Sequence, residues 1–132
     1  MATADSIGDD EILLRHIPGG TPWQASGPRT TSANFHLRRD CGETGISVTR
    51  LSMTGPERLL ELVGGDPQGG SRVAAVRVGD VRALGLRVVS RPLEADPGHA
   101  EIQSLEANLD DRAVRKRLAC LFQFLPETPP VS

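Results

Sequence analysis

Short apolar runs, each closed by glycine or proline, constrain the fold of this chain more than any other feature of its sequence. The run EILLRHI at 11–17 is followed by Pro18-Gly19-Gly20, and the run ERLLELV is followed by Gly64-Gly65. Because proline lacks a backbone donor and glycine permits chain reversal, such residues end strands and helices. The sequence therefore predicts a series of short helices and strands.

Hydrophobic periodicity assigns each run to a strand or a helix. The predicted strands are 11–17 (or one helical turn there), 33–37, 45–51, 72–78, 86–90 and 99–102. The predicted helices are 54–63, one turn within 79–86, and 111–125. Because the turn residues DCGET separate 33–37 from 45–51, these two strands are expected to form a hairpin.

The ends of the two earlier helices carry recognisable caps. Thr54 and Glu57 have capping-box spacing, in which each side chain accepts from the other's free backbone N–H. Gly64 is expected to end that helix. In GDVRALG, Asp80 and Gly85 are the predicted N-cap and C-cap of the single turn.

Together these elements predict an α+β fold: a single compact domain with a mixed β-sheet, one capped mid-chain helix and a C-terminal helix. With 132 residues the chain fits one domain, expected to cover 11–125 between a disordered lead at 1–10 and a Pro-rich disordered tail at 126–132. Aromatic residues make up only 3% of the chain, so the core must rely on Leu, Val, Ile and Ala.

Charge argues against two classes of partner. The net charge is −2, from 15 basic and 17 acidic residues, so no overall positive field draws the protein to nucleic acid or anionic membranes. The cluster RAVRKR at 112–117 could contact phosphates, but an amphipathic helix with such a cluster is more often a solvated surface helix. We therefore expect neither a membrane nor a nucleic-acid partner.

Composition also suggests where the protein works. Fourteen of the 15 basic residues are arginine, with Lys116 the exception, which together with abundant Ala, Gly and Pro is typical of a GC-rich bacterial genome. Cys41 and Cys120 form no disulfide framework or metal-binding spacing, and no apolar stretch approaches the ~20 residues that span a bilayer. The acidic N-terminus does not resemble a signal peptide. We expect a soluble, cytoplasmic bacterial protein.

No established catalytic motif is present: the chain has no Walker loop, Cys-x-x-Cys, His-Glu-x-x-His or nucleophile elbow. The three histidines have no metal-type spacing, so structural roles are expected for them and no metal site. Polar groups gather instead where the Gly- and Pro-rich loop 18–31 enters a strand, at Arg29, Ser32 and His36. Together with Arg15 and His99, these residues form the predicted ligand- or partner-binding site.

The layout of the chain resembles a family of small bacterial proteins to which no activity is assigned. The features that carry this resemblance are TSANF, GISVTR, LGLRVV and the late HAEI, within about residues 11–105. It implies a shared fold.

A more distant similarity is to the RES-type toxins, which are related to ADP-ribosyltransferases and act on NAD. It would assign the early arginine to Arg15, the nucleotide-facing segment to Arg29 and Ser32, and an acidic role to Glu57 or Glu61. The chain departs from that family in having no tyrosine and no Arg-Trp-Asn motif.

Two hypotheses follow, and the sequence does not decide whether the protein is an enzyme. The first is an accessory or protein-interaction module without a cofactor, whose protein partner is encoded nearby, for example in a defence or toxin–antitoxin locus. The alternative is an NAD-using transferase or NAD-degrading enzyme, in which Arg15 and Arg29 would hold the pyrophosphate.

Overall fold

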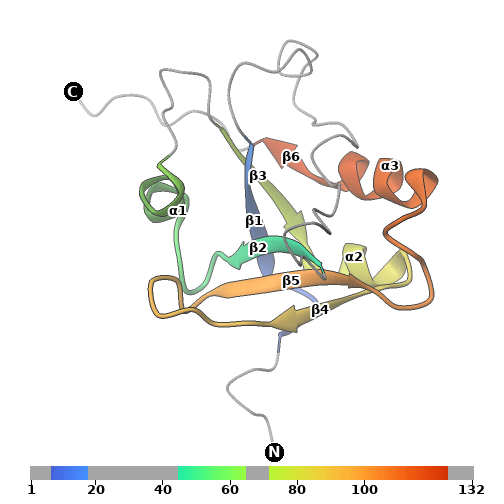
Figure 1. Cartoon of the computed structure of the whole chain (residues 1–132), viewed down its shortest axis with the longest axis horizontal. Helices are drawn as coiled ribbons and strands as arrows, with labels where there is room; N and C mark the ends of the chain where they lie inside the picture. The colour runs from blue at the N-terminus through green and yellow to red at the C-terminus, as the bar shows by residue number, and fades with distance from the viewer. Residues whose placement is uncertain (1–6, 18–44, 65–71, 125–132) are drawn as a thin grey trace, which may run out of the picture.

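The computed structural model describes residues 7–17, 45–64 and 72–124, which fold around a six-stranded sheet (Figure 1). Across the sheet the strands follow the order β4-β5-β2-β1-β3-β6. The strands are β1 (Ile12–Ile17), β2 (Ile46–Arg50), β3 (Arg72–Arg77), β4 (Leu86–Ser90), β5 (His99–Ser104) and β6 (Gln123–Phe124). The helices are α1 (Pro56–Val63), α2 (Val78–Ala83) and α3 (Arg112–Leu121). The predicted α+β class and the compact single domain are confirmed.

The sheet is antiparallel throughout its described ladders, so the prediction of a mixed sheet is wrong. Strands β2 and β3 run in the same direction and are joined through α1, a connection that could have made a parallel pair. However, β1 lies between them and is antiparallel to both. Pairing is thus decided by a strand that lies far from β3 in the sequence.

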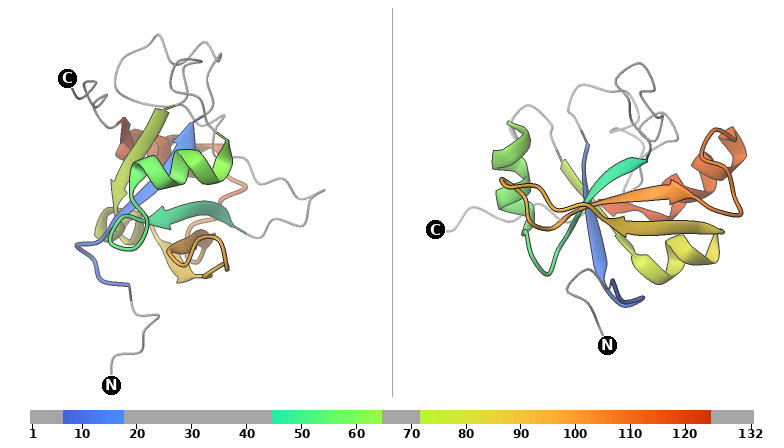
Figure 2. Two further views of the ribbon diagram at one scale, coloured as in Figure 1. Left: turned by 90° about the vertical axis from the view of Figure 1, so that its left-hand side faces the viewer. Right: turned by 60° about the horizontal axis from the view of Figure 1, so that its bottom comes forward.

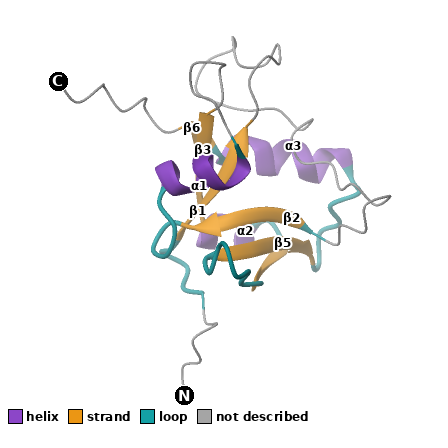
Figure 3. Ribbon diagram, turned by 60° about the vertical axis from the view of Figure 1, so that its left-hand side comes forward, coloured by secondary structure: helices purple, strands orange, loops and turns teal. Residues whose placement is uncertain are grey.

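The two faces of the sheet support two apolar clusters. Successive residues of a strand point to opposite faces, and the neighbours Leu13 and Leu14 show this on β1. Leu13 belongs to the large cluster that includes residues of α2 and α3, whereas Leu14 packs with Leu59 of α1 and Val73 of β3. Figures 2 and 3 show α1 on one side of the sheet, away from α2 and α3. Full burial of each leucine contributes about 1.5–3 kcal/mol.

Helix α1 begins without the predicted capping box. Its N-cap is Gly55, no side chain caps it, and Pro56 occupies the first turn. The Thr54 hydroxyl donates to Asp96 instead, so it does not cap the helix. At the other end Gly64 has φ 67°, a left-handed conformation that glycine adopts without strain, which confirms the predicted end of this helix.

Helices α2 and α3 also differ from their predicted bounds. The N-cap of α2 is Arg77 rather than Asp80, which lies in the first turn and pairs with Arg77. Helix α3 ends at Leu121 rather than 125, because Phe122 is fully buried and the chain then turns back to pair with β3. Its N-cap is Asp111, whose carboxylate accepts from the Ala113 amide.

Two further predictions, the hairpin that includes 45–51 and the disordered lead at 1–10, can be compared only in part with the structure. Strand β2 lies between β1 and β5, so it is an interior strand, and its expected hairpin partner at 33–37 lies outside the described residues. Residues 7–10, predicted as part of a disordered lead, form a turn in which Ile7 is buried in the large cluster. The described part of the domain therefore starts before residue 11.

Candidate functional site

Three of the five predicted site residues, Arg29, Ser32 and His36, lie outside the described residues, as do Cys41 and the loop 18–31. The two that are described, Arg15 and His99, do not share a face of the sheet. Thr49 is paired with both Leu14 and His99, so the His99 side chain lies on the Leu14 face. Arg15 follows Leu14 and points to the opposite face.

Arg15 has a structural partner. The recorded pairing of β1 with β2 stops at Leu14 and Thr49. Beyond that point the Arg15 guanidinium donates from Nη1 to the Ser47 carbonyl at 2.7 Å. This bond joins the two strands where their ladder ends, and it uses the same guanidinium that the NAD-binding alternative would assign to a pyrophosphate.

The described histidines also make local contacts. The Nδ1 atom of His99 is 2.9 Å from the Arg91 carbonyl, across the β4–β5 pair. Partial burial lowers the pKa of His16 below its ordinary value, and the neighbouring Arg15 charge acts in the same sense. Within 7–17, 45–64 and 72–124, no three His, Cys, Asp or Glu side chains gather as metal ligands do.

A buried carboxylate that the sequence analysis did not single out organises one end of the sheet. Asp96 accepts from the Thr49 hydroxyl at 2.7 Å, the Thr54 hydroxyl at 2.7 Å and the Gly98 amide at 3.2 Å. The two threonine bonds join the end of β2 and the turn after it to the loop between β4 and β5. We call residues 49–54 and 91–99 the Asp96 corner. The Gly98 bond is an Asx turn, which the sequence DPG could have indicated.

Backbone bonds reinforce this corner. The Arg50 amide donates to the Gly98 carbonyl at 2.8 Å, and the Thr54 amide donates to the Arg50 carbonyl at 2.9 Å. Leu93 and Asp96 exchange two backbone bonds, which close the loop between the strands. Gly98 is closely packed, since a Cβ there would lie 3.0 Å from the Met53 Cβ. Both turns are therefore held in one arrangement.

Three apolar side chains of the Asp96 corner are exposed. Leu51 is 40% exposed, Met53 49% and Leu93 54%. They account for most of the exposed large hydrophobic side chains in the described segments, the others being Val63 and Leu105. The buried polar groups of the corner bond to one another, so its exposed surface includes these apolar side chains together with the charged Arg91 and Glu94.

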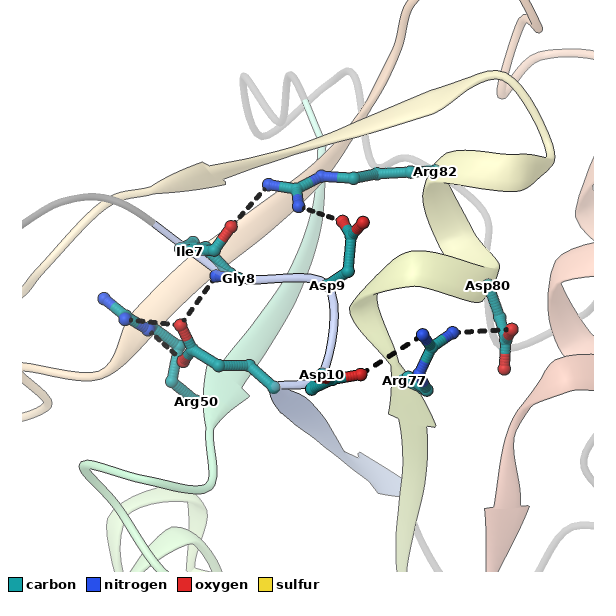
Figure 4. A network of polar contacts seen from close by, with 9 residues as sticks. Ile7, Gly8, Asp9, Asp10, Arg50, Arg77, Asp80 and Arg82 are labelled. Carbon is teal, nitrogen blue, oxygen red and sulfur yellow. Dashed lines mark hydrogen bonds and ion pairs between the residues drawn. The ribbon is translucent and has the colours of Figure 1, made fainter. Parts of the chain in front are cut away.

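The N-terminal turn, residues 7–11, is held differently, by arginine–carboxylate pairs (Figure 4). Arg50 forms two bonds of 2.8 Å with Glu11, and Arg77 lies 3.2 Å from Asp10. Arg82 contacts Asp9 and the Ile7 carbonyl. The bonds from Arg50 lower the pKa of Glu11 below its ordinary value, although partial burial acts in the opposite sense.

An open groove of about 460 Å³ lies where this turn meets the Asp96 corner, beside the Arg50–Glu11 bonds that join the two. It is lined by residues 8–12 on one side and by Leu51 and Ser52 on the other. Since its surface is largely apolar and Leu51 belongs to the corner, the groove extends the apolar surface of that corner.

The basic cluster of α3 lies largely on the exposed side of the helix. Arg112, Lys116 and Arg117 are exposed, as the solvated-helix prediction requires, and Arg115 donates to the Leu109 carbonyl at 2.9 Å. Cys120 is an exposed thiol near the end of the same helix. Nowhere in the described segments is a helix long and apolar enough to cross a bilayer.

Comparison with known proteins leaves the family open: no protein-family model, curated protein or solved structure matches this chain significantly. The resemblances to a small bacterial family and to the RES-type toxins therefore stay predictions from sequence motifs.

Proposed function

We propose that this protein is a protein-interaction module of the bacterial cytoplasm, an accessory to a partner protein encoded nearby. The observation that carries the proposal is the Asp96 corner, where Leu51, Met53 and Leu93 stand exposed on two turns that buried hydrogen bonds tie together. A defence or toxin–antitoxin locus is the expected genomic setting.

The rigidity of the corner favours this role. Ordering loops and side chains on binding costs free energy, so a surface already held in one conformation binds with less loss. Apolar side chains at the centre of an interface contribute most of its affinity when they become fully desolvated. Leu51 and Leu93 could each contribute about 1.5–2 kcal/mol on burial by a partner.

Affinity capture with matched variants tests the proposal. The tagged protein is used to capture the neighbouring gene product, alongside the double variants Leu51→Ser/Leu93→Ser and Val63→Ser/Leu105→Ser. Both variants remove two exposed apolar side chains. Each such surface substitution should change the free energy of unfolding by no more than about 0.5 kcal/mol. We expect only the first to lose the partner. Equal retention by both variants, or a protein that captures nothing specifically, contradicts the proposal.

The NAD-using alternative stays a prediction, and no contact among the described residues favours it over the structural role of Arg15. A ligand that binds only the folded state raises the melting temperature. A clear rise with millimolar NAD, together with NAD consumption in a turnover assay, would therefore favour the enzyme over the interaction module.

A further inference from the structure

Strand β4 is an edge strand whose outer side is unpaired within the described residues. Its register with β5 runs from Leu86–Ser104 to Ser90–Ala100, and no other described strand lies beside it. The opposite edge of the sheet ends in β6, which has only two residues. Figure 1 shows β4 along the border of the sheet, away from β1 and β3. An exposed edge of this kind is a template for another strand.

The pattern of backbone bonds identifies the groups that face outward. The Arg91 amide donates to the His99 carbonyl at 2.9 Å, which makes these residues a hydrogen-bonded pair in the β4–β5 register. Since bonded and non-bonded pairs alternate in antiparallel ladders, Val89 and Arg87 also bond to β5. The N–H and C=O groups of Val88 and Ser90 therefore point away from the sheet.

Two arginines give this edge a positive face. Arg87 and Arg91 lie on the face opposite Val88, and both are exposed. Arg87 donates from Nε to the Gln103 amide oxygen at 3.0 Å, and the Nε atom of Arg91 lies 3.9 Å from a Glu101 oxygen. These contacts use Nε, so the outer nitrogens of both guanidinium groups remain available for a bidentate carboxylate.

The edge leads directly into the proposed binding surface. The chain leaves β4 at Ser90 and reaches Leu93 of the Asp96 corner three residues later. On its other face Val88 is only partly buried and packs against the large apolar cluster. A segment lying along β4 would thus meet arginines on one face, an apolar side chain on the other, and exposed leucine at its end.

We propose that the partner adds an extended segment to β4 as a seventh strand, and that this segment alternates acidic and apolar residues. The backbone of Val88 and Ser90 would supply affinity, while Arg87 and Arg91 would select the acidic residues. This inference rests on the proposed function, because it names how the partner of the same surface binds. A second copy of this chain is a poorer fit, since antiparallel self-pairing centred on Val88 brings two Arg87 side chains onto one face.

Amide hydrogen exchange with a defined peptide tests the pairing. The probe is the blocked peptide Glu-Val-Glu-Val-Glu-Val, with Lys-Val-Lys-Val-Lys-Val as its charge-reversed control. Strand addition should slow exchange of the Val88 and Ser90 amides at least tenfold and leave the Val89 amide, already bonded to β5, unchanged. Protection without this alternation, equal protection by the lysine peptide, or no change at millimolar peptide would overturn the proposal.

Matched variants separate backbone pairing from charge. Ser90→Pro removes an outward N–H and keeps the ladder to β5, whereas Ser90→Ala retains that N–H. We expect at least tenfold weaker peptide binding by Ser90→Pro and none of that loss by Ser90→Ala. Arg87→Gln should weaken peptide binding about fivefold, because it removes one exposed ion pair with the peptide. Arg112→Gln on α3 should leave peptide binding unchanged. Equal binding by Ser90→Pro and Ser90→Ala would contradict the proposal.

These outcomes are distinguishable from failure of the proposed function. If the partner needs Leu51 and Leu93 but binds Ser90→Pro normally, the interaction module stands and the added strand is wrong. If no partner is captured and no peptide binds, both proposals fail. Self-association that Ser90→Pro abolishes would identify a second copy as the occupant and overturn the assignment to a foreign segment.

Discussion

The Asp96 corner and the N-terminal turn are both held by polar contacts, but in different environments. In the corner, a buried carboxylate accepts from two hydroxyls and a backbone amide. In the turn, arginines pair with carboxylates at or near the surface, and the Asp10 side chain is 97% exposed. Water competes for the exposed pairs of Arg77 and Arg82 and not for the buried bonds of the corner, so the corner bonds should contribute more to stability than those pairs.

The largest predicted effect is on Asp96. Replacing it with alanine leaves two buried hydroxyls without an acceptor, which should lower the free energy of unfolding by about 2–4 kcal/mol. Urea denaturation measures this. A loss below about 0.5 kcal/mol would remove the distinction between the two regions.

A double-mutant cycle sharpens the same point. Thr54 donates to Asp96 rather than capping α1, so Thr54→Ala and Asp96→Ala should share a coupling energy of about 1 kcal/mol. The cycle of Thr54→Ala with Glu57→Ala serves as the control, and its coupling should be near zero. A larger coupling energy between Thr54 and Glu57 than between Thr54 and Asp96 would show that the capping box forms after all.

The next effect is on Arg50, the most buried arginine of the turn's ion pairs, at 9% side-chain exposure. Arg50→Met should lower the free energy of unfolding by about 1–2 kcal/mol at pH 7. Because the folded-state pKa of Glu11 is lowered, its stabilisation is present above the ordinary value of 4.5 and is lost as pH falls through the folded-state pKa. As pH falls, the free energy of unfolding should therefore decrease less steeply in Arg50→Met than in the unchanged protein. An unchanged profile would show that Glu11 does not contribute.

The smallest effects belong to the exposed pairs. Arg77→Gln and Arg82→Gln should each change stability by no more than about 0.5 kcal/mol, and 1 M salt should abolish even that difference. Unfolding curves at low and high salt measure both. Losses comparable to that of Asp96→Ala would contradict the role assigned to burial.

Local sequence signals predicted part of the local structure, although the N-caps expected at Thr54 and Asp80 did not form. The strand at 86–90 and the glycine that ends α1 are as predicted, because propensity and turn chemistry decide them within a few residues. The prediction of a mixed sheet was wrong because β1 pairs with both β2 and β3 and lies between them. No short sequence pattern encodes that pairing.

The candidate site shows the same division. The Asx turn at Asp96 was readable from DPG, but its partners Thr49 and Thr54 lie 47 and 42 residues away. Thr54 has the same local signal whether it caps α1 or bonds Asp96, and only the folded chain decides between them. For Arg15 and His99, strand alternation and register place the side chains on opposite faces, which residue type alone does not reveal.

The affinity of the captured partner tests the central claim, that the Asp96 corner is the binding surface, most directly. Isothermal titration calorimetry would compare the protein with Leu93→Ser and with Leu105→Ser, which removes a somewhat more exposed leucine elsewhere (62% against 54%). Loss of about 1.5 kcal/mol predicts a Kd at least tenfold weaker for Leu93→Ser and an unchanged Kd for Leu105→Ser. Equal affinity of the two variants would contradict the assignment of the corner.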